Sequence, residues 1–127
     1  MCMVSGEKTN VEAAHIMPVS CKLSVLKKTL GLSGQEVGWV RNGLFLVTVI
    51  HKAFDSLQIA FVKSNPLSTA LYLTIIDDEC RSNPLFSGSS HTIEDVEGQQ
   101  LQLGEHKAFL RGLSYHAYQA FLKHNID

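Results

Sequence analysis

Residues 41–55 read RNGLFLVTVIHKAFD, and within them an apolar run changes into a run of mixed polarity. The apolar, β-branched part predicts a brief strand over residues 44–47. From Thr48, a residue type favoured at the N-cap position, we expect a short helix through Asp55. On that helix His51 and Asp55 are four residues apart, so their side chains lie on one face, one turn from each other.

The spacing of His51 and Asp55 allows two interpretations. Imidazole and carboxylate groups are both common ligands of divalent metals, so the pair could hold a cation. A histidine and an aspartate at this spacing more often form a hydrogen bond on the helix surface. A third functional group from a distant strand is needed to favour the metal site.

Such a group is present in EAAHIMP, residues 12–18. Residues 10–16 alternate weakly in polarity, which predicts a short strand that Pro18 ends. His15 therefore lies at the end of a regular element, which could hold its ring in place.

The three blocks EAAHIMP, RNGLFL and HKAFD together resemble the signature of the HNH nucleases. In that signature a histidine leaves a strand, and an Asn-Gly pair opens a second strand. Another histidine follows on a helix, nine residues after the asparagine. The sequence is most similar to HNH variants that have AAHI in the first strand and H-x-x-F-D on the helix.

The resemblance covers about residues 2–63, roughly half of the chain. It implies an α+β fold with a ββα-metal core, in which two strands pack against one helix. We expect residues 1–127 to form a single HNH nuclease-like domain. The motif core would lie at about 2–63, and additional C-terminal strands with a closing helix would lie at about 64–127.

The resemblance also implies a role for each motif residue. His15 would be the general base that takes a proton from water, because imidazole titrates near neutral pH. Asn42 would fix the orientation of His15. His51 and Asp55 would hold a divalent metal ion, Mg²⁺ or Mn²⁺ in the first place and Zn²⁺ as the alternative, and this ion would bind the scissile phosphate.

These roles describe a metal-dependent endonuclease that hydrolyses phosphodiester bonds in nucleic acid, with double-stranded DNA as the expected partner. Arg41 and Lys52 flank the motif residues and are natural contacts for phosphates. Two alternatives remain: a catalytically lapsed HNH-fold module that binds nucleic acid or a protein partner, and a metal-binding domain of different chemistry.

One departure from the usual pattern keeps the lapsed module in consideration. Many HNH enzymes have Asp, Glu or His directly before the catalytic histidine as a further metal ligand, and this sequence has Ala14 there. Glu12 is on the same side of the strand as Ala14 but two residues further back. We expect Glu12 to form an ion pair at the strand edge or a hydrogen bond to a loop, rather than to bind the metal.

Composition limits the remaining possibilities. With 45% hydrophobic and 18% charged residues in 127, the chain is expected to fold as one domain rather than stay disordered. Its three cysteines show no C-x-x-C spacing, and Ser5 stands where the partner of Cys2 would be, so we expect neither disulfides nor a structural zinc site. There is no apolar signal-peptide core and no run of transmembrane length, so we expect an intracellular protein, cytoplasmic or nuclear.

Charge is distributed unevenly although the net charge is −1. Basic residues dominate residues 20–63, and acidic residues dominate residues 77–105. This distribution favours a local site for polyanions over general binding to nucleic acid.

The rest of the chain predicts further elements and a core. We expect a helix within residues 20–34, strands within 57–64 and 68–77, a strand at 99–103, and a closing helix capped by Ser114. The other four histidines are expected to be surface or capping groups: His91, His106, His116 and His124. The candidate core residues are Val11, Phe45, Phe54, Ile59, Phe61, Leu71, Leu73 and Ile75.

Overall fold

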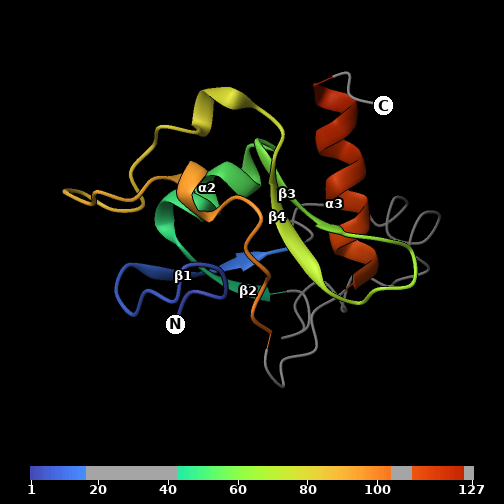
Figure 1. The fold of residues 1–127 in the computed structure, drawn as a ribbon, viewed down its shortest axis with the longest axis horizontal. Helices are drawn as coiled ribbons and strands as arrows, with labels where there is room; N and C mark the ends of the chain where they lie inside the picture. The colour runs from blue at the N-terminus through green and yellow to red at the C-terminus, as the bar shows by residue number, and fades with distance from the viewer. Residues whose placement is uncertain (17–42, 104–109, 125–127) are drawn as a thin grey trace.

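The fold is a mixed α+β arrangement of two small antiparallel sheets and two α-helices within the described residues (Figure 1). It is given by a computed structural model that describes residues 1–16, 43–103 and 110–124. The first sheet pairs β1 (Val11–His15) with β2 (Gly43–Val47), and the second pairs β3 (Ile59–Lys63) with β4 (Leu71–Ile75). The helices are α2 (Thr48–Asp55) and α3 (Leu110–Lys123), and the short 3-10 helices are η4 (Asp78–Cys80) and η5 (Ile93–Val96). The helix expected within residues 20–34 lies outside the described residues.

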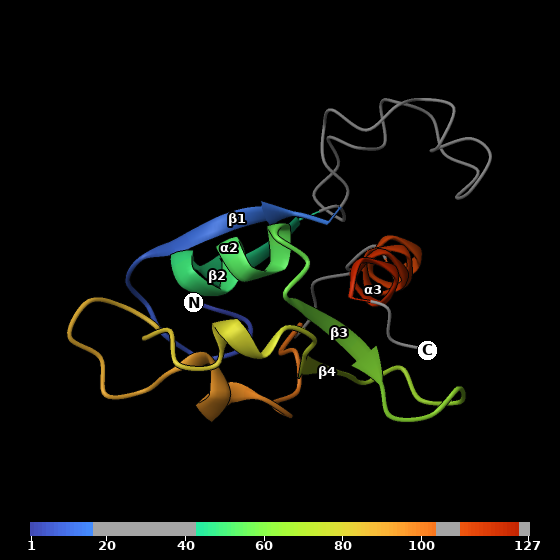
Figure 2. The same cartoon turned by 90° about the horizontal axis from the view of Figure 1, so that it is seen from above.

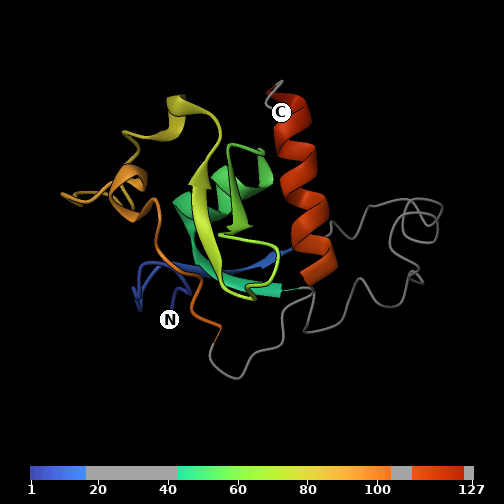
Figure 3. The ribbon, with the colours of Figure 1, turned by 45° about the vertical axis from the view of Figure 1, so that its right-hand side comes forward.

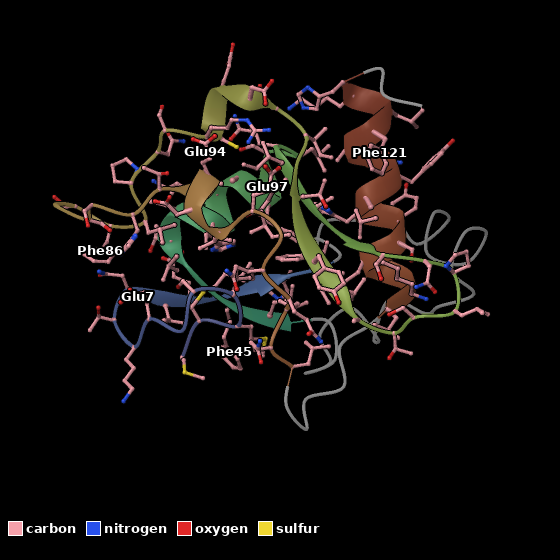
Figure 4. The ribbon with its side chains drawn as sticks, viewed as in Figure 1. Glu7, Phe45, Phe86, Glu94, Glu97 and Phe121 are labelled. Atoms are coloured by element: carbon pink, nitrogen blue, oxygen red, sulfur yellow. The ribbon has the colours of Figure 1, made fainter. Side chains whose placement is uncertain are left out.

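The β1–β2 sheet has one covered face and one open face. Residues paired across an antiparallel sheet share a face, and Ala14 pairs with Leu44 while Ala13 pairs with Phe45. Ala14 and Leu44 are each 1% exposed, whereas Phe45 is 47% exposed. Phe45 lies on the side of β2 that faces away from α2 (Figure 4). The expectation that Phe45 belongs to the core is therefore wrong, because strand alternation turns it to the open face.

Strand β2 leads directly into α2. Val47 has the extended backbone of an N-cap residue, with φ −60° and ψ 152°, and Thr48 is the first residue of the helix. The N-cap expected at Thr48 is therefore displaced by one residue. The Thr48 backbone N–H and hydroxyl both donate to the carbonyl oxygen of Asn10, at 3.0 and 3.2 Å. The threonine thus ties the start of α2 to the chain just before β1 and does not cap the helix.

Helix α2 buries one face and leaves the other accessible. Ile50, Ala53 and Phe54 are buried at the spacing of an amphipathic helix, and α2 contacts β1, β2 and β3. In Figure 2, α2 runs beside β1 and in the same direction. The ends of β1 and α2, His15 and Asp55, consequently lie at the same end of this β1–β2–α2 unit.

The core joins both sheets into one body. Phe54 of α2 and Phe61 of β3 have ring centroids 5.7 Å apart, and Leu44, Leu46, Ile59 and Leu73 are each no more than 1% exposed. A smaller cluster lies between β3 and α3, with Ala60, Ala117 and Ala120 at its centre. Figure 3 shows α3 standing against the β3–β4 sheet.

Two expectations for the C-terminal half are wrong. Helix α3 begins at Leu110, so Ser114 lies inside the helix and does not cap it. Leu113, which is 1% exposed, already packs in the core, and the apolar face of the helix therefore begins before Ser114. The segment 99–103 is no strand, because it contributes only an isolated bridge between Gln100 and Tyr72.

An arginine braces the acidic segment that follows β4. Arg81 Nη1 is 2.8 Å from Glu97 Oε1, and Arg81 Nε is 2.5 Å from Asp78 Oδ1. The other carboxylate oxygen of Glu97 accepts a hydrogen bond from the Ile75 backbone N–H at 3.0 Å. Figure 4 shows Glu97 and Glu94 on the segment that carries η5. Part of the acidic charge of residues 77–97 therefore has a structural use.

None of the described helices has the length and apolar character that a membrane crossing requires.

Candidate active site

His51 lies between two carboxylates, one from its own helix and one from β1. Its Nε2 atom is 3.0 Å from Oδ2 of Asp55, and its Nδ1 atom is 2.8 Å from Oε1 of Glu12. The His51 side chain is 22% exposed, and both carboxylates are exposed. These three side chains form one accessible group, which we call the His51 cluster.

Helix geometry and strand parity bring the His51 cluster together. The four-residue spacing places Asp55 one turn after His51, as the sequence predicts. Glu12 is two residues before buried Ala14 and so projects from the face of β1 that α2 covers. The sequence predicted a hydrogen bond or ion pair for Glu12 but not its partner. The one sequence signal for that partner was that Glu12 and Ala14 lie on the same side of the strand.

The two ring nitrogens of His51 set an electrostatic condition on the cluster. A neutral imidazole has one N–H and one lone pair. When the Nδ1–H donates to Glu12, the lone pair of Nε2 faces a carboxylate oxygen of Asp55. Two lone pairs at 3.0 Å repel each other unless a positive charge lies between them, either a proton on Nε2 or a bound cation.

The donor chemistry of the pair fits a divalent cation. Two neighbouring donors of an octahedral ion, each at about 2.1 Å from it, lie about 3 Å apart. The Nε2–Oδ2 separation of 3.0 Å matches that value. Histidines that bind metals usually donate their other N–H to a carboxylate, which fixes the ring. Glu12 is in position to do this for His51.

The ligand set offered by the described residues is small. No group of three or more His, Cys, Asp or Glu side chains among them is arranged to hold a metal ion. Water and phosphate oxygens would have to fill the remaining positions. Mg²⁺ and Mn²⁺ tolerate this better than Zn²⁺, which usually takes three or four protein ligands.

His15 is exposed and is the last residue of β1, where it pairs with Gly43. Strand alternation puts it on the open face with Ala13 and Phe45, and not on the face of Glu12. Within the described part of the chain, no hydrogen bond or ion pair joins His15 to His51 or Asp55. The structure thus places His15 at the same end of the unit as Asp55 without bringing the two side chains together.

The other predicted site residues are placed only in part. Lys52 is exposed on α2, next to His51. Asn42 and Arg41 lie outside the described residues.

His116 was expected to be a surface or capping group, and this expectation is wrong. It is 7% exposed, and its Nε2 atom is 2.6 Å from the carbonyl oxygen of Phe54 at the end of α2. Its ring stacks on the Phe54 ring with centroids 3.7 Å apart. Burial lowers the pKa of His116, so the neutral ring is favoured. The sequence signal for this burial was the spacing of His116 with Leu113, Ala117 and Ala120 on one helix stripe.

Ala14 stands where many HNH enzymes have a further metal ligand, and this position gives a first prediction. Ala14→Asp would place a carboxylate where the side chain is 1% exposed, beneath α2. We expect the variant without metal to lose about 3 kcal/mol of stability, because a buried charge without a partner is costly. A divalent ion would offset part of this loss and bind more tightly than in the wild type, because the carboxylate adds an oxygen donor. Thermal unfolding with and without Mn²⁺ measures both effects. A variant whose melting temperature does not respond to Mn²⁺ would contradict the prediction.

Comparison with known proteins finds a family match in the N-terminal part of the chain. Residues 2–62 match the model of a protein family described as HNH endonuclease. This segment contains all three members of the His51 cluster and also His15. No curated protein and no solved structure matches the chain.

Proposed function

We propose that the protein is a metal-dependent endonuclease that hydrolyses phosphodiester bonds in DNA, on the basis of the match of residues 2–62 to the HNH endonuclease family. The observation that carries the proposal is the geometry of the His51 cluster inside the matched segment. Nε2 of His51 lies 3.0 Å from Oδ2 of Asp55, a separation that suits two ligands of one divalent ion, and Nδ1 lies 2.8 Å from Oε1 of Glu12, so the geometry supports the proposal. In this proposal β1, β2 and α2 are the ββα-metal core.

Each residue of the core has a separate task. The His51 Nε2 atom and the Asp55 carboxylate hold the ion, and Glu12 accepts the Nδ1–H of His51 and keeps the ring in place. When bound, the divalent ion would supply positive charge to the scissile phosphate and to the leaving oxygen.

His15 is the proposed general base. One of its ring nitrogens takes a proton from water, the resulting hydroxide attacks the phosphorus, and the bond from phosphorus to the leaving oxygen breaks. His15 is exposed at the end of β1, at the same end of the unit as Asp55, so water and substrate have access to it. Asn42 is proposed to orient His15. Strand alternation puts His15 on the face of β1 opposite to α2, the helix that carries His51. The ring of His15 therefore has to reach around the edge of the strand toward the His51 cluster.

Phosphate contacts are proposed for the basic residues near the core. Lys52 is exposed and follows His51 on α2, and its long side chain is proposed to contact a phosphate bound at the cluster. Arg41 is the second proposed contact. The acidic residues braced by Arg81 would repel DNA, so the duplex is expected to lie over β1 and α2.

The proposed function is tested by incubating supercoiled plasmid with the protein and Mg²⁺, Mn²⁺ or Zn²⁺. Cleavage that requires the metal and that chelation by EDTA stops is expected. The same reactions on single-stranded DNA and on RNA decide the substrate. Absence of cleavage with every metal and every substrate would refute the proposal.

A second candidate is a lapsed HNH-fold module that binds nucleic acid without cutting it. The specific observation in its favour is Ala14, a buried apolar residue where many HNH enzymes have a third metal ligand. A shift of the DNA band on a native gel, without cleavage in the presence of any of the three metals, would favour this module over the enzyme.

The Glu12 side chain gives a second prediction. Glu12→Gln keeps an oxygen that accepts the Nδ1–H of His51 but removes the negative charge. We expect the affinity for Mn²⁺ to fall about tenfold, because carboxylates behind metal-binding histidines contribute affinity of this order. Isothermal titration calorimetry measures it.

The matched control for Glu12→Gln is Glu7→Gln. Glu7 lies before β1, and its substitution removes the same charge; among the described residues its side chain forms no hydrogen bond or ion pair with the His51 cluster. Its affinity for Mn²⁺ should equal that of the wild type. Equal losses in both variants would show that only net charge matters, and would remove Glu12 from the proposed site.

A further inference from the structure

The end of α2 that carries Asp55 is a turn under backbone strain. The Gln58 N–H donates to the Ala53 carbonyl at 2.9 Å, and the Leu57 N–H donates to the Phe54 carbonyl at 3.1 Å. This is the Schellman pattern that ends many helices, in which glycine usually takes the left-handed position. Here Leu57 takes it, with φ +61°. A leucine disfavours this conformation, so surrounding contacts must hold the turn.

Helix α3 supplies those contacts. His116 Nε2–H donates to the carbonyl oxygen of Phe54 at 2.6 Å, and Lys123 Nζ donates to the carbonyl oxygen of Ser56 at 2.9 Å. The Leu57 side chain packs against the alanine cluster that includes Ala117 and Ala120. One helix thus contacts three successive parts of the turn. We call this set of contacts the α3 clamp.

Within the α3 clamp, the imidazole of His116 has one polar contact among the described residues. Its other nitrogen, Nδ1, is buried and has no hydrogen-bond partner there. A buried nitrogen without a partner is unfavourable, and an apolar ring of similar size would avoid it. The specific contribution of histidine at this position is therefore the hydrogen bond to Phe54, one residue before Asp55.

The α3 clamp comes from outside the HNH segment, which ends at residue 62. We propose that His116 is a positioning residue for the metal pair. By fixing the last turn of α2, it holds the Asp55 carboxylate 3.0 Å from Nε2 of His51. The inference rests on the proposed metal site, and it makes the C-terminal helix a part of the site's machinery.

The test compares two substitutions at His116. His116→Phe keeps an aromatic ring against Phe54 and removes the donor, whereas His116→Gln keeps an N–H close to the position of Nε2. We expect His116→Phe to weaken Mn²⁺ binding about tenfold in calorimetry well below its melting temperature, and His116→Gln to restore it to within about threefold of the wild type. In the metal-free protein, the amide hydrogens of Leu57 and Gln58 should exchange with solvent faster in His116→Phe than in the wild type.

Two further variants keep the test decisive. Lys123→Met removes the exposed half of the α3 clamp with little risk to folding, and it should speed exchange of the same amides. Ile93→Val, in the core at η5, is a control that lowers the melting temperature without touching the turn. It should leave Mn²⁺ affinity unchanged.

The outcomes separate this inference from the proposed function. Wild-type affinity and exchange rates in His116→Phe would overturn the positioning role, as would an equal loss of affinity in Ile93→Val. A wild-type chain that binds no Mn²⁺ would refute the metal site itself. The amide exchange rates in the metal-free protein would then still decide whether His116 holds the turn.

Discussion

His15→Ala is expected to slow DNA cleavage by about two to four orders of magnitude, the usual contribution of a general base. Alanine cannot take the proton from water, so attack on the phosphorus would depend on hydroxide from solution. His15 has no hydrogen bond or ion pair to the His51 cluster in the described residues, so Mn²⁺ affinity should stay within about twofold of the wild type. Plasmid nicking under single-turnover conditions, with calorimetry in parallel, measures both quantities.

The result for His15→Ala supports a general base only if the cleavage rate falls while the Mn²⁺ affinity is kept. Raising the pH should recover part of the rate in the variant, because the concentration of hydroxide rises. A variant that cuts at the wild-type rate would show that His15 is not the base. A variant that also loses Mn²⁺ would instead make His15 a ligand.

His51→Ala and Asp55→Ala are each expected to lower Mn²⁺ affinity at least about a hundredfold and to abolish metal-dependent cleavage. The reason is the small ligand set, in which no third protein donor among the described residues can compensate. Removing either ligand leaves a single donor on α2, and one carboxylate or one imidazole on a surface binds divalent ions weakly. Calorimetric titration of Mn²⁺ into the three proteins is the measurement.

The chain offers a matched control for this pair. His91 and Asp95 are also four residues apart, exposed, with Nδ1 3.7 Å from Oδ2. His91→Ala should leave Mn²⁺ affinity and cleavage at wild-type values. If His91→Ala lowered the affinity as much as His51→Ala, the ion would be bound by exposed histidine–aspartate pairs in general, and the proposed site would be refuted.

The sequence predicted those parts of the site that depend on local geometry. His51 and Asp55 needed only the helical repeat to be placed together, and the run over residues 44–47 continued into the helix as expected. The HNH resemblance is confirmed for residues 2–62. Glu12 could not be assigned its partner, because the contact depends on how α2 folds back across the β1–β2 sheet, and that is a property of packing.

Burial was the least predictable feature for the same reason. Phe45 has the apolar character of a core residue, but two adjacent apolar residues in a strand point to opposite faces, and only the position of α2 decides which face is covered. His116 has the polarity of a surface residue, yet its place on the apolar stripe of α3 buries it against Phe54. In both cases the elements that pack against the strand or the helix, and not its own residues, determined whether the side chain is buried.

The contact between Glu12 and His51 spans 39 residues of the chain, whereas β3 and β4 are joined by a short turn. Closing a long loop loses more chain entropy, so pairings between residues close in sequence form earlier during folding. We expect the hairpin of β3 and β4 to assemble with α2 first, and β1 to dock late. A partly folded chain would then carry His51 and Asp55 side by side before Glu12 reaches them, so the complete cluster is a property of the fully folded protein alone.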